Sequence, residues 1–153
     1  MSIPRWTPRT ETTKQEERRL KSLGKTRKLL VFLRTYRDRL FDEAFQTELS
    51  SMYRDTGEGI APVPPALLAM TLLLQGYEGI GDARAIEHTW SDKGWQMVLD
   101  VDSDEPAFGQ GTLSAFRERL IAHDMDRRLL ERTVELAKET EQGQEDGGRM
   151  ASC

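Results

Sequence analysis

Cysteine is nearly absent from this chain of 153 residues, because its single example, Cys153, is the final residue. One terminal thiol provides neither a disulfide framework nor paired thiolate ligands for a metal, which favours a reducing compartment, so we predict a cytoplasmic protein. The two histidines, His88 and His123, stand far apart, so the spacing of a zinc site is missing too. We therefore expect no metal and no cofactor.

Long apolar runs are also missing. The N-terminus carries Pro4, Arg5 and Arg9 where a signal peptide would have its apolar segment. The longest strongly apolar run, 66–74, is broken only by Thr71 and would cover about 14 Å as a helix, whereas a membrane-spanning helix must cross ~30 Å of hydrocarbon. This run predicts a buried helix in a soluble protein.

Acidic residues are scarce in the first part of the chain, although the net charge of the whole chain is −4. Residues 1–40 hold twelve Lys and Arg against four acidic residues, a net +8, which leaves −12 for the remainder. Such a cationic arm is able to follow a phosphate backbone, with Arg27 and Lys28 as candidate contacts. A solvated, partly disordered leader explains the same charges equally well.

Apolar spacing and helix-breaking residues predict an all-α chain, a compact bundle of about five to six helices with a helix-turn-helix-like element and flexible termini. Residues 1–24 are polar and interrupted by prolines, so we expect a flexible arm, or a frayed helix over 11–23, that adds little to the core. The apolar residues of 29–40 have a mostly helical period, and we predict a helix there, although 29–33 alone would also suit a strand.

Helix signals follow in the middle of the chain. Asp42 is a candidate N-cap for a helix over 43–53 whose inner face carries Phe45, Leu49 and Met52. Residues 55–65 should form a loop that ends at paired prolines. A helix then begins near Pro65 and runs to about Tyr77; it is apolar nearly all round, so we predict the central helix of the bundle, ended by the glycines at 76, 79 and 81.

The second half continues in the same way. Asp82 is the expected cap of a helix over 83–90, and a short helical turn follows Gly94. We expect the tryptophans of these two segments, Trp90 and Trp95, in the core. Residues 100–106 read as an acidic linker.

Asp124 is the expected cap of a last helix over 125–140. Its predicted inner face carries Leu130, Val134 and Ala137, with Arg127 and Glu131 outside. The polar tail 141–153 should be disordered.

The segment 108–120, Phe-Gly-Gln-Gly-Thr-Leu-Ser-Ala-Phe-Arg-Glu-Arg-Leu, runs from a glycine turn into a short helix. Leu113, Phe116 and Leu120 share one stripe, which predicts burial of that side. The other side resembles a DNA-reading helix of a helix-turn-helix element. Its candidate DNA-binding residues are Thr112 and Ser114, for phosphates or base edges, and Arg117 and Arg119, for guanine or phosphate.

Two observations weaken this hypothesis. Glu118 lies between the two arginines and would repel phosphate unless it accepts from a cytosine amino group. A helix that merely packs, and carries charge toward solvent, has the same pattern and remains the alternative.

Three segments in order, 64–87, 95–99 and 111–120, carry a resemblance to a known family. They contain the patterns P-x-x-L-x-x-x-x-L-L-Q, G-x-x-D and T-L-S-x-F-R-x-R-L at the family's spacing. The chain resembles, over about 38–140, the N-terminal (InsH-type) domain of bacterial insertion-sequence DDE transposases. The resemblance implies a helical domain, preceded by the basic arm 1–37, that recognises the terminal inverted repeats of a mobile element.

Complete members of that family continue into an RNase H-like catalytic domain, whose chemistry needs carboxylates on a mixed sheet holding two divalent ions. The residues after Thr140 cannot supply such a sheet. The acidic run from Asp100 resembles the start of a calcium loop, but Glu105 and Gly111 stand where glycine and a bidentate glutamate are required. No nucleophile motif or phosphate-binding loop occurs either. We therefore expect no enzyme activity.

These observations lead to two hypotheses. The first is a non-catalytic module that binds double-stranded DNA at inverted repeats, a truncated or frameshifted remnant of a transposase. The alternative is a protein-protein interaction module that associates with itself or with a full-length transposase. The acidic remainder of the chain and the apolar richness of the helix after Pro65 support this alternative.

Overall fold

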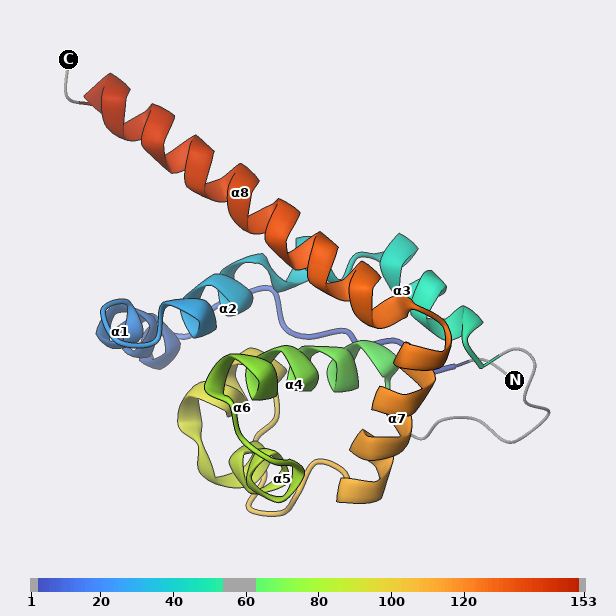
Figure 1. Ribbon diagram of the computed structural model, residues 1–153. Helices are drawn as coiled ribbons and strands as arrows, with labels where there is room; N and C mark the ends of the chain where they lie inside the picture. Colours follow the sequence, from blue (N-terminus) through green and yellow to red (C-terminus); the bar gives the residue numbers. More distant parts are fainter. Residues whose placement is uncertain (1–2, 54–62, 152–153) are drawn as a thin grey trace.

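The computed structural model describes residues 3–53 and 63–151, with side chains as far as Glu141. Over these ranges the chain forms eight α-helices and no strand (Figure 1). All-α architecture is therefore confirmed, but five to six helices was too few. The helices are α1 (Lys14–Leu23), α2 (Lys28–Leu40), α3 (Glu43–Ser51), α4 (Pro65–Glu78), α5 (Asp82–Ser91), α6 (Lys93–Leu99), α7 (Gln110–Ala122) and α8 (Met125–Ala151).

Helix α4 occupies the centre, as predicted, and packs against α3, α5, α6 and α7. Pro65 provides the first helical residue, and every residue from Pro65 to Thr71 is buried. Gly79 ends the helix with φ +64°, a left-handed conformation in which a side chain would be strained. Most of the loop expected over 55–65 lies outside the described residues.

Capping explains several other helix boundaries. Asp42 accepts a hydrogen bond from the Phe45 N–H at 2.8 Å and begins α3, as predicted. Asp92, which the sequence analysis overlooked, accepts from the Trp95 N–H and begins α6. The cap of α5 is Gly81, so Asp82 is its first helical residue instead of its cap.

Segment 29–33 belongs to α2, so the strand alternative is wrong. Of the two tryptophans expected in the core, Trp95 is fully buried but Trp90 is 40 % exposed.

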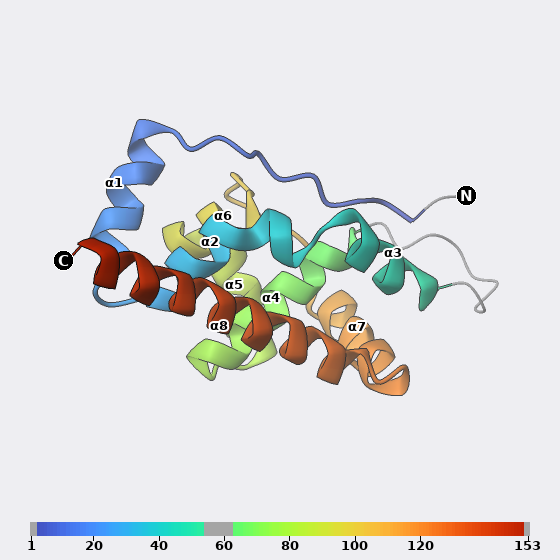
Figure 2. The same cartoon turned by 90° about the horizontal axis from the view of Figure 1, so that it is seen from above.

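Helix α8 crosses α2 and α7 along one side of the molecule and extends beyond it (Figures 1 and 2). As far as Glu141, where its side chains are described, its buried residues are Leu129, Thr133 and Leu136, so the predicted inner face was wrong by one position. Leu130 and Val134 are 59 % and 43 % exposed. The stripe that contains Leu129 and the stripe that contains Leu130 both have helical spacing, because the two leucines are adjacent.

Contacts made by arginines fix the orientation of α8. Arg132 donates to the Leu40 carbonyl at 2.7 Å, and Arg128 pairs with Glu48 at 3.4 Å, which turns Leu129 and Leu136 inward. Asp124 has φ 55°, not the extended backbone of an N-cap residue. The helix also continues past the end predicted near Thr140, so 141–151 is helical instead of disordered. Glutamate and glutamine in this stretch are good helix formers, which offsets its glycines.

The N-terminal segment 3–13 lies along the body as an extended strap (Figure 2). Trp6 is 7 % exposed and meets the edge of the Phe41 ring at 5.6 Å between centroids. Its backbone N–H donates to Gln46 Oε1 at 2.8 Å, and Gln46 Nε2 donates back to the Trp6 carbonyl. The expectation that this segment adds little core is therefore wrong.

Two buried arginines of α2 hold the strap and α6 to α2. Arg37 is 2 % exposed and donates to the carbonyls of Met97 and Val98 at the end of α6, and to that of Arg9. Burial lowers the pKa of Arg37 to about 10, and the neighbouring Arg34 contributes to the decrease. Arg34 pairs with the buried Glu16 of α1 at 3.1 Å.

Among the described residues, no helix combines the length and the apolar character that crossing a bilayer requires.

We expect Trp6→Ala to lower the free energy of unfolding by about 3 kcal/mol, because it removes a buried indole and leaves a cavity beside Phe41. Urea unfolding followed by far-ultraviolet circular dichroism measures the change. Trp90→Ala is the matched control, and its effect should be clearly smaller. Equal effects of the two substitutions would show that the strap does not belong to the folded unit.

Candidate nucleic-acid interface

Helix α7 has the two-sided character that its sequence predicted. Leu113, Phe116 and Leu120 are at most 2 % exposed. Glu118 and Ala115 are exposed on the other side, whereas Thr112 and Ser114 are half-buried near the helix N-terminus. The packing of this helix is confirmed, and its binding role stays a prediction.

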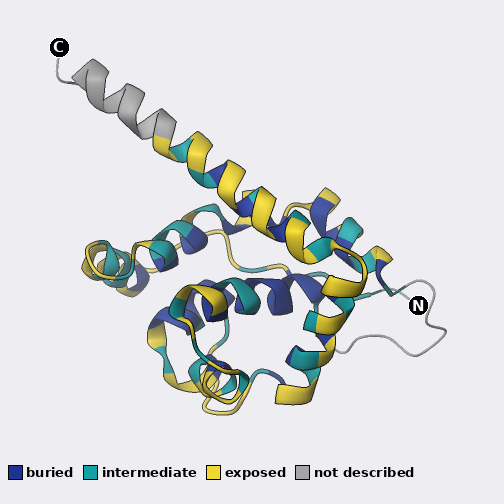
Figure 3. Cartoon of the chain, in the orientation of Figure 1, coloured by how far each residue is buried: buried dark blue, intermediate teal, exposed yellow. Residues whose placement is uncertain are grey.

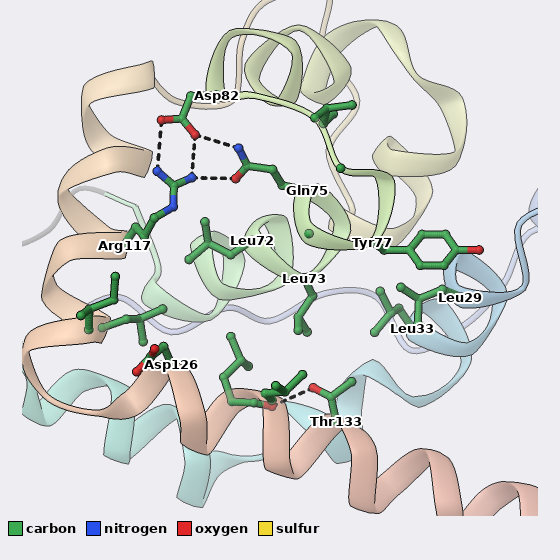
Figure 4. A pocket seen from close by; sticks show the side chains of 17 residues that line it. Leu29, Leu33, Leu72, Leu73, Gln75, Tyr77, Asp82, Arg117, Asp126 and Thr133 are labelled. Carbon is green, nitrogen blue, oxygen red and sulfur yellow. Dashed lines mark hydrogen bonds and ion pairs between the residues drawn. The ribbon is translucent and has the colours of Figure 1, made fainter.

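Arg117 lies in a closed polar cluster with Gln75 and Asp82 (Figure 4). Its guanidinium donates to both Asp82 oxygens, at 3.1 and 2.6 Å, and to Gln75 Oε1 at 2.8 Å. Gln75 Nε2 in turn donates to Asp82 Oδ1 at 2.7 Å. This cluster attaches α7 to α4 and α5 and uses both terminal nitrogens of Arg117.

Arg119 is also held within the molecule. It donates to the Met52 carbonyl at 3.0 Å, and its guanidinium lies 4.2 Å from the centre of the Tyr53 ring. Burial raises the pKa of the Tyr53 hydroxyl, and the charge of Arg119 partly opposes this shift. Arg117 or Arg119 would have to give up these intramolecular contacts in order to contact DNA.

The candidates at the start of α2 differ from each other. Arg27 pairs with Asp92 at 3.1 Å and with Glu78, so it joins α2 to α4 and α6. Burial acts to lower the pKa of Arg27, but its hydrogen bonds with Asp92 and Glu78 outweigh burial and the net shift is upward. Lys28, the first residue of α2, is exposed.

Helix α1 presents the largest group of uncommitted cations. Thr13 caps this helix, with its side chain accepting from the Glu16 N–H at 3.1 Å. Glu16 is buried and Leu20 and Leu23 are half-buried on the inner side. Lys14, Arg18 and Lys21, at i, i+4 and i+7, are exposed on the outer side, which Lys25 and Lys28 extend across the following turn. We name these five residues the α1 ridge.

None of the five ridge residues has a hydrogen bond or ion pair with the rest of the described chain. Most of the other cations in the first 40 residues are arginines bound within the protein, namely Arg5, Arg9, Arg27, Arg34, Arg37 and Arg39. Arginine suits buried and bidentate pairs, whereas lysine keeps its hydration. The basic segment is thus divided into a structural part and an exposed part.

The charge of this segment is evident from the sequence, but the helix face on which it gathers was not predicted. The spacing of Lys14, Arg18 and Lys21 was the available signal.

The connection before α7 is long. Residues 100–109 separate α6 from α7, whereas a helix-turn-helix joins its two helices by a turn of about three or four residues. The helix-turn-helix prediction is therefore unconfirmed. The described part of the chain also has no cluster of three or more His, Cys, Asp or Glu side chains placed to hold a metal ion.

Comparison with known proteins identifies the class. The transposase domain family DUF772 matches residues 19–119, about two thirds of the chain, and the protein belongs to this family. The match includes most of the α1 ridge and nearly all of α7 up to Arg119. No curated protein and no solved structure matched the chain.

Asp82→Asn should make the protein less sensitive to acid. The hydrogen bonds from Arg117, and then that from Gln75, hold the pKa of Asp82 below its ordinary value near 3.8. A lowered carboxyl pKa stabilises the fold at pH values above the ordinary pKa, and this contribution is lost as the pH falls through the folded-state pKa.

The variant should be less stable than the wild type at pH 7, and the difference should shrink on acidification below about pH 4. Urea midpoints measured across pH would show this. Asp104→Asn, in an exposed loop, is the control. A constant difference at all pH values would show that the Asp82 carboxylate does not interact in this way.

Proposed function

We propose that this protein is a non-catalytic DNA-binding domain of a transposition system and that it engages the phosphate backbone of double-stranded DNA through the α1 ridge. The observation that carries the proposal is the ridge itself, five exposed cations on a capped helix and the turn that follows it, in a chain whose net charge is −4. Membership of the transposase domain family supplies the biological context.

The ridge suits phosphates better than bases. Its lysines are flexible point charges, which neutralise phosphate without reading sequence. Glu17 is the acidic residue exposed on the same helix, and Glu16 is already paired with Arg34 and Arg9. Backbone binding of this kind would orient the domain on the duplex.

Sequence recognition, if the domain performs it, would need a second element, for which α7 remains our candidate. Thr112 and Ser114 lie at its N-terminal end, where phosphate oxygens and base edges are both suitable acceptors. Arg119 would have to leave the Met52 carbonyl and the Tyr53 ring to join them. The terminal inverted repeats of a mobile element are the DNA we propose for this contact.

Binding of duplex DNA should become less salt-dependent when ridge charges are removed. We expect Arg18→Gln with Lys21→Gln to reduce the slope of log K against log salt by about 0.9 for each phosphate that the ridge no longer neutralises. Arg84→Gln with Lys93→Gln removes the same charge from two other exposed positions and should leave the slope nearly unchanged. Fluorescence anisotropy at several salt concentrations measures the slopes, and equal slopes for the two double variants would exclude the ridge.

Recognition by α7 has a separate test. If α7 reads sequence, Arg119→Ala should weaken binding to an inverted-repeat duplex by roughly tenfold and binding to a scrambled duplex much less. Thr47→Ala, on the exposed side of α3, serves as the control. Equal affinity of the wild type for both duplexes, unchanged by Arg119→Ala, would refute recognition by this helix while leaving backbone binding by the ridge intact.

A further inference from the structure

Four large apolar side chains are exposed in one region of the surface. Tyr77, Ile121 and Leu130 line a groove of about 840 Å³ between α2, α4, α7 and α8 (Figure 4), and Val134 follows Leu130 one turn along α8. The walls of this groove are largely aliphatic, with Leu29, Leu72 and Leu73 among them. Exposed apolar surface of this kind commonly marks a site of protein association.

The charged residues of helix α8 fall into two sets, one paired with the body of the protein and one exposed on the outer side. On the flank toward the body, Arg128 pairs with Glu48, Arg132 lies 3.7 Å from Asp42, and Glu139 pairs with Arg39 at 3.0 Å. On the outer side, Arg127, Glu131, Lys138 and Glu141 are exposed and make no ion pair with the described residues. Figure 3 shows this exposed outer side along the helix.

The outer residues form one stripe. Arg127, Leu130, Val134, Lys138 and Glu141 follow one another at spacings of three and four, which keeps them on the same side of the helix. The stripe therefore has an apolar centre, Leu130 and Val134, and charged ends.

The outermost charges of the stripe, Arg127 and Glu141, have opposite signs and lie at equal distances from Val134. Arg127 lies seven residues before Val134 and Glu141 seven residues after it, while Glu131 lies three before and Lys138 four after. In an antiparallel pair of identical helices with Val134 at the two-fold axis, residues at equal distances before and after it face each other. Each Arg127 then meets a Glu141, each Leu130 lies opposite the aliphatic stem of a Lys138, and Val134 meets Val134. A parallel pair would instead oppose like charges.

We infer that α8 is the interface for a second copy of this chain, docked antiparallel with Val134 at the two-fold axis. Val134 of both copies forms the apolar centre, flanked by each Leu130 against the stem of Lys138 in the other copy, and the pairs of Arg127 with Glu141 set the register and the direction. The second copy also covers the rim of the adjacent groove at Leu130. This inference does not depend on DNA binding.

Sedimentation equilibrium of the full chain over a range of concentrations tests the interface. The wild type should reach a dimer, and Val134→Glu should raise the dimer Kd by at least about a hundredfold, because it removes the apolar centre and places two like charges at the axis. Trp90→Glu changes an exposed apolar residue of α5 that does not line the groove, and its Kd should match the wild type. Circular dichroism confirms that both variants are folded.

Charge reversal tests the register. Arg127→Glu and Glu141→Arg should each weaken self-association by about tenfold, because each places like charges opposite each other twice. An equimolar mixture of these two variants, and the double variant Arg127→Glu with Glu141→Arg, should both recover wild-type association. Arg84→Glu changes the net charge as much as Arg127→Glu does but lies on α5, outside the stripe, so its Kd should match the wild type. A mere effect of net charge would weaken both variants equally.

The inference is overturned by either of two results. A wild type that stays monomeric at every concentration would leave the groove to a different partner. A dimer that survives Val134→Glu, or whose Kd is unchanged by the charge reversals, would use another surface.

Discussion

The fold depends on a guanidinium buried at the end of a helix. The last carbonyls of α6 have no partner within their own helix, and the C-terminal end of a helix carries partial negative charge. Arg37 donates to two of these carbonyls from α2 and to the Arg9 carbonyl of the strap. Asp100, at the C-cap of α6, accepts from the Arg9 side chain. One buried cation thus joins segments far apart in the sequence, which commits the basic N-terminal region to the body.

The intramolecular contacts of the basic N-terminal residues determine which cations remain available to bind a ligand. Arg5, Arg9, Arg34 and Arg37 are used to hold the strap, α1 and α2 in place. The charge that remains for a ligand is carried mainly by the lysines of the α1 ridge. Along α8, the charged residues are divided in a similar way between contacts to the body and the exposed outer stripe. The structure therefore separates a cationic face on α1 from an apolar face on α8.

Much of the helical core was predictable because local signals agreed with the fold. Asp42 as a cap, Pro65 as a helix start and the buried stripe of α7 at Leu113, Phe116 and Leu120 were all readable from spacing. The inner face of α8 was not, because Leu129 and Leu130 are equally apolar and the contacts of Arg128 and Arg132 with distant residues decide between them. Long-range contacts also ordered Trp6, whose polar, proline-containing surroundings predict a flexible segment.

The candidate site was predictable in composition and not in geometry. The sequence shows that residues 1–40 are basic, but it does not show which cations have partners, since Asp92, Asp100 and Glu78 lie far along the chain. For the same reason, Arg117 was a candidate DNA contact in the sequence although Asp82 and Gln75 hold it. Pairing partners distant in sequence decide whether a charged residue is free to bind.

The strap has a practical consequence for anyone dissecting this protein. The family match starts at residue 19, and the boundary expected from sequence falls at residue 38. A fragment cut at either place would lack the indole that covers Phe41 and the backbone carbonyl that receives Arg37. Cutting at residue 38 would remove Arg37 as well, so the carbonyls at the end of α6 would lose their hydrogen-bond donor. Boundaries taken from sequence similarity would therefore yield an incompletely sealed core, prone to aggregate during purification.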